Sequence, residues 1–308
     1  MSPTGQGHYC VQLVWVQMTK QTPILFIYGF GFTADHLLPL ICSNWRVFAS
    51  TRSESKAELL RRRNVEPIIM SETVQDDLST LEQPFHVLVT APPQNGICPA
   101  FRDLNHPNAK LTGITYLSTT GVYGDHSGGW VYEDTPTSPQ SKRATARVVA
   151  EEAWAQLARQ NGIPFRTVRL PGIYGPGRSA FDRLMEGRAR RIIKAGQVFS
   201  RIHVDDIANG LAALLDRSEL EGVFHLCDEE AAPPQDVIAF AAELLGMDVP
   251  PDIPFDSADL SPMARSFYAE CKRVSNVATK QRLDWAPEYP TYREGLAAIL
   301  ANMKKPQT

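Results

Sequence analysis

The stretch that decides the fold is PILFIYGFGFTADHLL, residues 23–38. Its first six residues, Pro23 to Tyr28, form a continuous apolar run with glycines directly behind it. Such a run is typical of a parallel strand buried on both faces, because a half-exposed strand alternates apolar and polar residues. The run therefore predicts a buried strand that leads through a glycine-rich turn into a helix.

Further short apolar runs follow at regular spacing, at residues 45–50, 66–70, 85–90, 114–118 and 165–170. Helix-like or loop segments lie between them, and strands that alternate with helices form a parallel sheet covered on both faces. After Leu170 the sequence becomes richer in proline and in short elements. We therefore predict an α/β Rossmann fold, with a doubly wound parallel sheet and a smaller C-terminal substrate lobe.

The chain divides into three parts on this interpretation. Residues 1–17 are expected to be an extension outside the fold, with an additional edge strand as the alternative, because Met18 begins a natural strand-first domain. Residues 18–170 form the Rossmann domain, which also receives a return segment near 199–226. Residues 171–308 form mainly the smaller substrate-binding lobe.

Composition excludes several classes of protein. The 308 residues are 43% hydrophobic and 21% charged with a formal net charge of -3, which is typical of a globular protein and not of a nucleic-acid-binding one. The five cysteines are widely spaced without a C-x-x-C pair, so neither a disulfide framework nor a zinc site is expected and a reducing cytoplasm fits best. The apolar run at residues 10–17 is shorter than the roughly 20 residues that span a bilayer.

The turn after the first strand predicts a dinucleotide site. Gly29, Gly31 and Ala34 follow the G-x-G-x-x-G/A pattern between the strand and the helix. Gly29 would allow a tight turn, Gly31 would let the backbone approach a pyrophosphate, and Ala34 would permit close helix packing. A glycine turn that serves packing alone is the alternative.

Arg52 indicates which dinucleotide is bound. An Asp or Glu at the end of the second strand would bind the ribose 2′-hydroxyl of NAD. This chain has Thr51-Arg52-Ser53 there, and a guanidinium can bind a 2′-phosphate with two hydrogen bonds. NADP is therefore favoured over NAD, with a surface arginine as the competing interpretation.

The segment SPQSKRATARVVAEEAW, residues 138–154, predicts a long helix. Ser138 is a plausible N-cap with Pro139 at the first helical position, and Asn161-Gly162 is a typical end. Val148, Val149, Trp154 and Leu157 could serve either the core or a homodimer interface.

Three further stretches resemble the extended short-chain dehydrogenase/reductase superfamily, which includes nucleotide-sugar epimerases and dehydratases. They are YLSTTGVYGD (116–125), RLPGIYGPGR (169–178) and FSRIHVDDIANGL (199–211). The resemblance implies that Thr119 hydrogen-bonds the reacting oxygen. It also implies that Pro171 and Tyr174 lie in the loop beside the nicotinamide.

The chain departs from this superfamily at its acid–base pair. Members carry a Tyr and, four residues later, a Lys, commonly with a Glu four residues after the Lys. If Glu151 sets the register, Arg147 occupies the Lys position and Arg143 the Tyr position. Arginine keeps its proton throughout the working range, so Arg143 can bind an anion or orient a carbonyl but cannot exchange protons. A solvated Arg147–Glu151 pair is the structural alternative.

Two tyrosines are candidates to replace the missing acid. Tyr123 and Tyr174 could each bring a phenol near the cofactor, although the matching aromatic residues of the superfamily mostly pack or line the pocket. His203, Asp205 and Asp206 form no expected metal site, because adjacent carboxylates of the matching return segment point different ways. No metal is predicted.

Two hypotheses about function follow. The first is an NAD(P)-dependent oxidoreductase or epimerase-like enzyme that acts on an unidentified small or nucleotide-linked substrate. Its candidate catalytic residues are Thr119, Arg143 and Arg147. The second is a non-catalytic dinucleotide-binding protein, with a regulatory or redox-sensing role, whose active site is degenerate.

Overall fold

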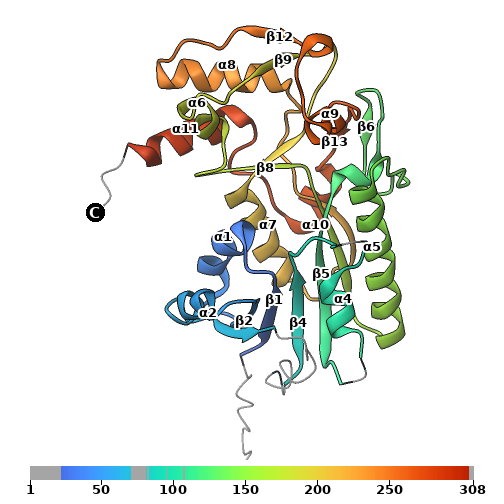
Figure 1. Ribbon diagram of the computed structural model, residues 1–308. Coiled ribbons are helices and arrows are strands. Elements are labelled where there is room, and N and C mark those ends of the chain that lie inside the picture. The colour runs from blue at the N-terminus through green and yellow to red at the C-terminus, as the bar shows by residue number, and fades with distance from the viewer. Residues whose placement is uncertain (1–21, 71–80, 82, 95, 107, 305–308) are drawn as a thin grey trace, which may run out of the picture.

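The computed structural model describes residues 22–304 apart from 71–80, 82, 95 and 107, so the predicted extension at residues 1–17 lies outside the described part. Within that part, seven parallel strands form one sheet in the order β11-β7-β5-β4-β1-β2-β3 (Figure 1). These are β1 (Ile24–Tyr28), β2 (Arg46–Thr51), β3 (Glu66–Ile69), β4 (Phe85–Val89), β5 (Leu111–Thr119), β7 (Phe165–Leu170) and β11 (Gly222–His225). The predicted α/β Rossmann fold is confirmed.

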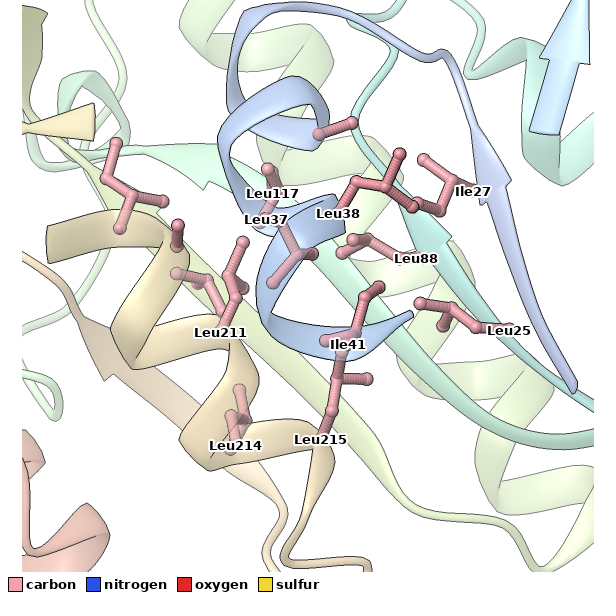
Figure 2. Packing of buried hydrophobic residues seen from close by; sticks show 14 of the residues in the cluster. Leu25, Ile27, Leu37, Leu38, Ile41, Leu88, Leu117, Leu211, Leu214 and Leu215 are labelled. Carbon is pink, nitrogen blue, oxygen red and sulfur yellow. The ribbon is translucent and has the colours of Figure 1, made fainter. Parts of the chain in front are cut away.

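Helices cover both faces of the sheet. One face carries α1 (Phe32–Ile41), α2 (Glu54–Arg61) and α7 (Val204–Leu215), and the other carries α4 (Pro99–Leu104) and α5 (Lys142–Asn161). Figure 2 shows Leu37 and Ile41 of α1 beside Leu211 and Leu215 of α7, all of them buried. The continuous apolar strands are explained by this arrangement, since every strand of the centre faces helices on both sides.

The long helix begins later than the sequence predicts. Its N-cap is Ser141, whose hydroxyl accepts a hydrogen bond from the amide of Ala144 (3.2 Å), and it ends at Gly162 in the left-handed conformation (φ 62°). Ser138 instead donates its amide to the carbonyl of Val122 (2.9 Å). The predicted start at Ser138 and Pro139 is therefore wrong, because a tertiary contact fixes that segment outside the helix.

The remaining elements form a smaller lobe and short sheet pairs. Buried residues of α6 (Ala180–Met185), α8 (Pro234–Leu245) and α11 (Tyr292–Met303) form a separate core. The short parallel pairs are β8 (Gly172–Tyr174) with β10 (Arg201–His203), β9 (Arg191–Ile193) with β12 (Asp252–Pro254), and β6 (Trp130–Val131) with β13 (Arg273–Val274). The short helices are η2 (Thr120–Tyr123), η3 (Phe255–Ser257), α9 (Pro262–Phe267) and α10 (Val277–Leu283). None of the helices in the described residues could cross a membrane, given their length and apolarity.

Candidate cofactor and active site

The first turn at the carboxyl edge of the sheet requires glycine. Gly29 has a positive φ of 97°, and its amide donates to the hydroxyl of Ser50 at the end of β2 (2.9 Å). A Cβ at this position would lie 3.0 Å from both the amide nitrogen of Ala91 and the hydroxyl of Thr90. The turn is therefore fixed between β1, β2 and β4, as the glycine pattern predicts.

The next residues leave backbone groups free at the start of α1. Gly31 is the N-cap, makes no side-chain capping bond, and a Cβ added there would meet nothing within 4 Å. Ala34 is buried in the core beneath α1. The first amides of a helix lack internal partners and attract anions, so this arrangement suits a bound phosphate.

Arg52 directly follows the last residue of β2 and is exposed. Its side chain makes no hydrogen bond or ion pair with any residue in the described ranges. On α2, Lys56 donates a hydrogen bond to the carbonyl of Phe30 within the glycine turn. The carboxyl end of β2 therefore presents one unpaired guanidinium and one lysine already engaged with the turn.

Thr119 and Pro171 come together at neighbouring strand ends. Thr119 is the last residue of β5 and pairs in register with Leu170, so Pro171 follows at the same edge. The Thr119 hydroxyl accepts a hydrogen bond from the amide of Gly121 (3.2 Å) and is half-buried. Because that bond uses an acceptor lone pair, the hydroxyl proton can still be donated to a ligand.

The two candidate arginines of α5 differ in their surroundings. Arg147 donates to the carbonyl of Leu117 (2.6 Å) and to the hydroxyl of Tyr116 (3.2 Å), so it fastens α5 to β5. Arg143, one helical turn nearer the start of α5, is exposed and has no partner among the residues that the structure describes. Arg143 is therefore the cation of the pair that is available to a ligand.

Glu151 does not pair with Arg147. Its carboxylate accepts two hydrogen bonds from Arg169 of β7, at 2.6 and 3.2 Å, and both side chains are buried. The solvated Arg147–Glu151 pair considered from the sequence is therefore wrong. Sequence reasoning missed Arg169, although an arginine inside the otherwise apolar strand FRTVRL was a signal for a buried partner.

The tyrosines considered as replacement acids are buried. The Tyr123 hydroxyl donates to Nε2 of His225 (2.5 Å) and accepts from Arg169 (2.7 Å), and burial raises its pKa to about 12. Tyr174 lies in the core of the smaller lobe, where its hydroxyl donates to the carbonyl of Thr291 (3.5 Å) and burial raises its pKa. Neither phenol is tuned for proton exchange near neutral pH.

His203, Asp205 and Asp206 form hydrogen bonds with other residues of the chain. Asp206 accepts the amides of Glu288 (2.6 Å) and Tyr289 (3.2 Å), and Asp205 contacts His36 (2.6 Å). Nδ1 of His203 accepts the amide of Asp205 (3.2 Å). In the described ranges no group of three or more His, Cys, Asp or Glu side chains could hold a metal ion.

Comparison with known proteins shows a related family and related structures. Residues 97–227 match the model of the NAD dependent epimerase/dehydratase family. A functionally unknown conserved protein from Silicibacter pomeroyi DSS has a similar solved structure, with TM-score 0.81, 43% identity and coverage of 91% of this chain and 99% of that one. Over residues 97–227 the chain therefore resembles the NAD dependent epimerase/dehydratase family.

Two other known proteins are similar to this chain. The solved structure of UDP-glucuronic acid 4-epimerase from Bacillus cereus in complex with NAD has TM-score 0.72 and 19% identity, over 91% of this chain and 96% of that one. A 3-diazoavenalumate denitrifying reductase from Streptomyces sp is 30% identical over 164 residues, which are 50% of this chain and 52% of the reductase. The match therefore spans about half the length of that reductase.

Proposed function

We propose that the chain is an NADP(H)-dependent reductase that transfers hydride to a strongly electrophilic substrate carrying an anionic group. The observation that carries this proposal is an exposed Arg143 without a partner in the described residues, at the position that the resemblance assigns to a tyrosine acid. A site of this kind can hold cofactor and substrate, but its arginine cannot deliver a proton.

Two parts of the dinucleotide find suitable groups in the chain. The free amides at Gly31 and the start of α1 suit the pyrophosphate, and Arg52 suits a 2′-phosphate. A solved structure of the same fold, the Bacillus cereus UDP-glucuronic acid 4-epimerase, is in complex with NAD. Thr119 and Pro171 would then lie beside the nicotinamide, as the resemblance to the superfamily implies.

The acid–base groups favour a reductase over an epimerase. An epimerase of this fold removes a hydroxyl proton and later returns it, which requires a group that titrates near the working pH. Burial raises the pKa of Tyr116, Tyr123 and Tyr174. An arginine side chain has no proton-accepting atom, so position 143 supplies no acid–base group. A substrate that accepts hydride without a protein proton fits such a site better.

A diazonium compound is an electrophile of that kind. Hydride from the nicotinamide would add to the terminal nitrogen, and the resulting diazene would lose N₂ as its hydrogen moves to carbon. Substrate and NADPH would thus give the hydrogen-substituted product, N₂ and NADP⁺, with no proton taken from the protein. The Streptomyces relative, a denitrifying reductase of a diazo compound, supports this chemical class.

The test compares two electrophiles that carry the same carboxylate. We expect the protein to oxidise NADPH with para-carboxybenzenediazonium, followed by loss of nicotinamide absorbance and release of N₂, and to leave para-carboxybenzaldehyde unchanged. A reaction without enzyme corrects for direct reduction. If saturating NADPH is bound but neither compound is reduced, the chain is a dinucleotide-binding protein without this activity.

A further inference from the structure

Arg178 is an exposed arginine in the connection between β8 and α6. A tight turn fixes its position, since the amide of Gly175 donates to the carbonyl of Arg178 (3.2 Å) and the amide of Arg178 donates to the carbonyl of Gly175 (3.0 Å). Gly177 supplies the left-handed residue of this turn (φ 71°). The backbone of Arg178 is therefore well defined, although its side chain reaches the surface.

The turn is pressed against the first residue of the phosphate-binding helix. A Cβ at Gly175 would lie 2.6 Å from Cγ1 of Val204 and 3.1 Å from the ring of Phe32, so only glycine fits. In the same turn, the guanidinium carbon of Arg178 lies 5.6 Å from the centre of the Phe32 ring. The amide of Phe32 is one of the free first-turn donors, so Arg178 sits one side chain away from the expected pyrophosphate.

The charge of Arg178 is not neutralised within the described chain. The acidic side chain in the first turn of α1, Asp35, pairs with Arg63, and Asp205 in the first turn of α7 contacts His36 (2.6 Å). Arg178 itself makes no ion pair and no side-chain hydrogen bond with a described residue. A guanidinium that lies over an aromatic ring keeps its N–H groups free. These N–H groups can donate two hydrogen bonds to one phosphate.

We propose that Arg178 binds the pyrophosphate of the dinucleotide from the side opposite the α1 amides. The proposal rests on the NADP(H) site described above. Arg178 directly precedes Ser179, the N-cap of α6, and α6 belongs to the core of the smaller lobe. The bound dinucleotide therefore joins the Rossmann sheet to the smaller lobe, which Figure 1 shows above α1.

Calorimetric titration with three ligands tests the contact. NADPH and ADP-ribose contain the pyrophosphate, whereas adenosine 2′-monophosphate does not. We expect Arg178→Ala to raise the Kd of the first two by about tenfold, which is the effect of one lost charged hydrogen bond, and to leave the third unchanged. Arg178→Lys should give an intermediate Kd, and Arg183→Ala, an exposed arginine of α6, is the matched control.

Unchanged ADP-ribose binding in Arg178→Ala would overturn the proposal and leave the NADP(H) site standing. An equal loss of all three ligands would also overturn it, because that result reports damage to the fold. A wild-type chain that binds none of the three would overturn the proposed function together with this inference.

Discussion

Glu151 and Arg169 are joined by two hydrogen bonds in the protein interior, and this pair connects α5 to β7. Arg169 also donates to the hydroxyl of Tyr123 in the turn that follows Thr119 (2.7 Å). One buried guanidinium therefore fixes both the helix that carries Arg143 and the strand end that carries Thr119. Loss of this pair should therefore shift both Arg143 and Thr119 relative to the sheet.

Arg169→Met should lower the free energy of unfolding strongly. Removal of one partner leaves the Glu151 carboxylate buried and uncompensated, which typically costs about 3–5 kcal/mol. The double variant Glu151→Leu with Arg169→Met should be less destabilised, because no uncompensated charge remains. Urea denaturation of both, beside the exposed control Arg62→Ala, measures the difference; equal losses in the single and double variants would contradict this account.

Gly31→Ala should lower NADPH affinity alone, whereas Gly29→Ala should also lower the free energy of unfolding. At Gly31 a methyl group meets no protein atom and φ is -127°, so stability should change little while NADPH affinity falls. At Gly29 the same change enforces strain at φ 97° and contacts at 3.0 Å, so the free energy of unfolding should fall as well. Thermal denaturation with and without NADPH distinguishes the two. A Gly31→Ala protein with full affinity would show that the cofactor does not approach this amide.

Arg52 should decide between the two dinucleotides. We expect NADP(H) to raise the melting temperature more than NAD(H) at equal concentration, since a ligand stabilises the state that binds it. Arg52→Asp should reverse this preference by repelling a 2′-phosphate and accepting a ribose hydroxyl. Equal shifts for both dinucleotides in the wild type would remove Arg52 from the site.

The double variant Arg143→Tyr with Arg147→Lys should gain weak carbonyl reduction with NADPH. It recreates a phenol and an ammonium on the face of α5 that Arg147 already directs toward β5, and a positioned acid–base group is typically worth about 10²- to 10⁴-fold. Lys142→Tyr with Ala146→Lys, shifted by one residue, is the matched control. Reduction of para-carboxybenzaldehyde is the measurement, and equal rates in both variants would show that the register set by Glu151 is wrong.

His86 should make stability depend on pH. Burial, with Arg166 adding to it, lowers its pKa from 6.5 to about 3, and its Nε2 lies 2.8 Å from the Thr115 hydroxyl. The folded state thus favours neutral His86, so its contribution is complete above pH 6.5 and is lost as pH falls from there toward 3. In His86→Gln the midpoint of urea denaturation should fall less than in the wild type as the pH is lowered over that range. A variant that follows the wild-type curve would exclude His86 as a cause.

The sequence allowed the sheet to be predicted because its strands are continuous apolar runs, a local signal that burial on both faces imposes. The glycine turn was also predictable from a local signal, because Gly29 adopts a positive φ that glycine tolerates best. The partners of charged residues were not. Glu151 and Arg169 are 18 positions apart, and only the packing of α5 on β7 decides that they meet. The packing of Tyr174 against residues of α8 and α11 was likewise not predictable, because these helices lie far from it in the sequence.

Gly295 of α11 lies beneath the ring of Tyr174, where a Cβ would come within 2.1 Å of the hydroxyl oxygen. Gly295 therefore cannot gain a side chain alone: any larger residue at 295 requires a smaller one at 174. Homologous chains should therefore carry a residue larger than glycine at position 295 only where position 174 holds a side chain shorter than tyrosine. Such a pair of changes would mark a group of homologues in which the core of the smaller lobe is packed differently.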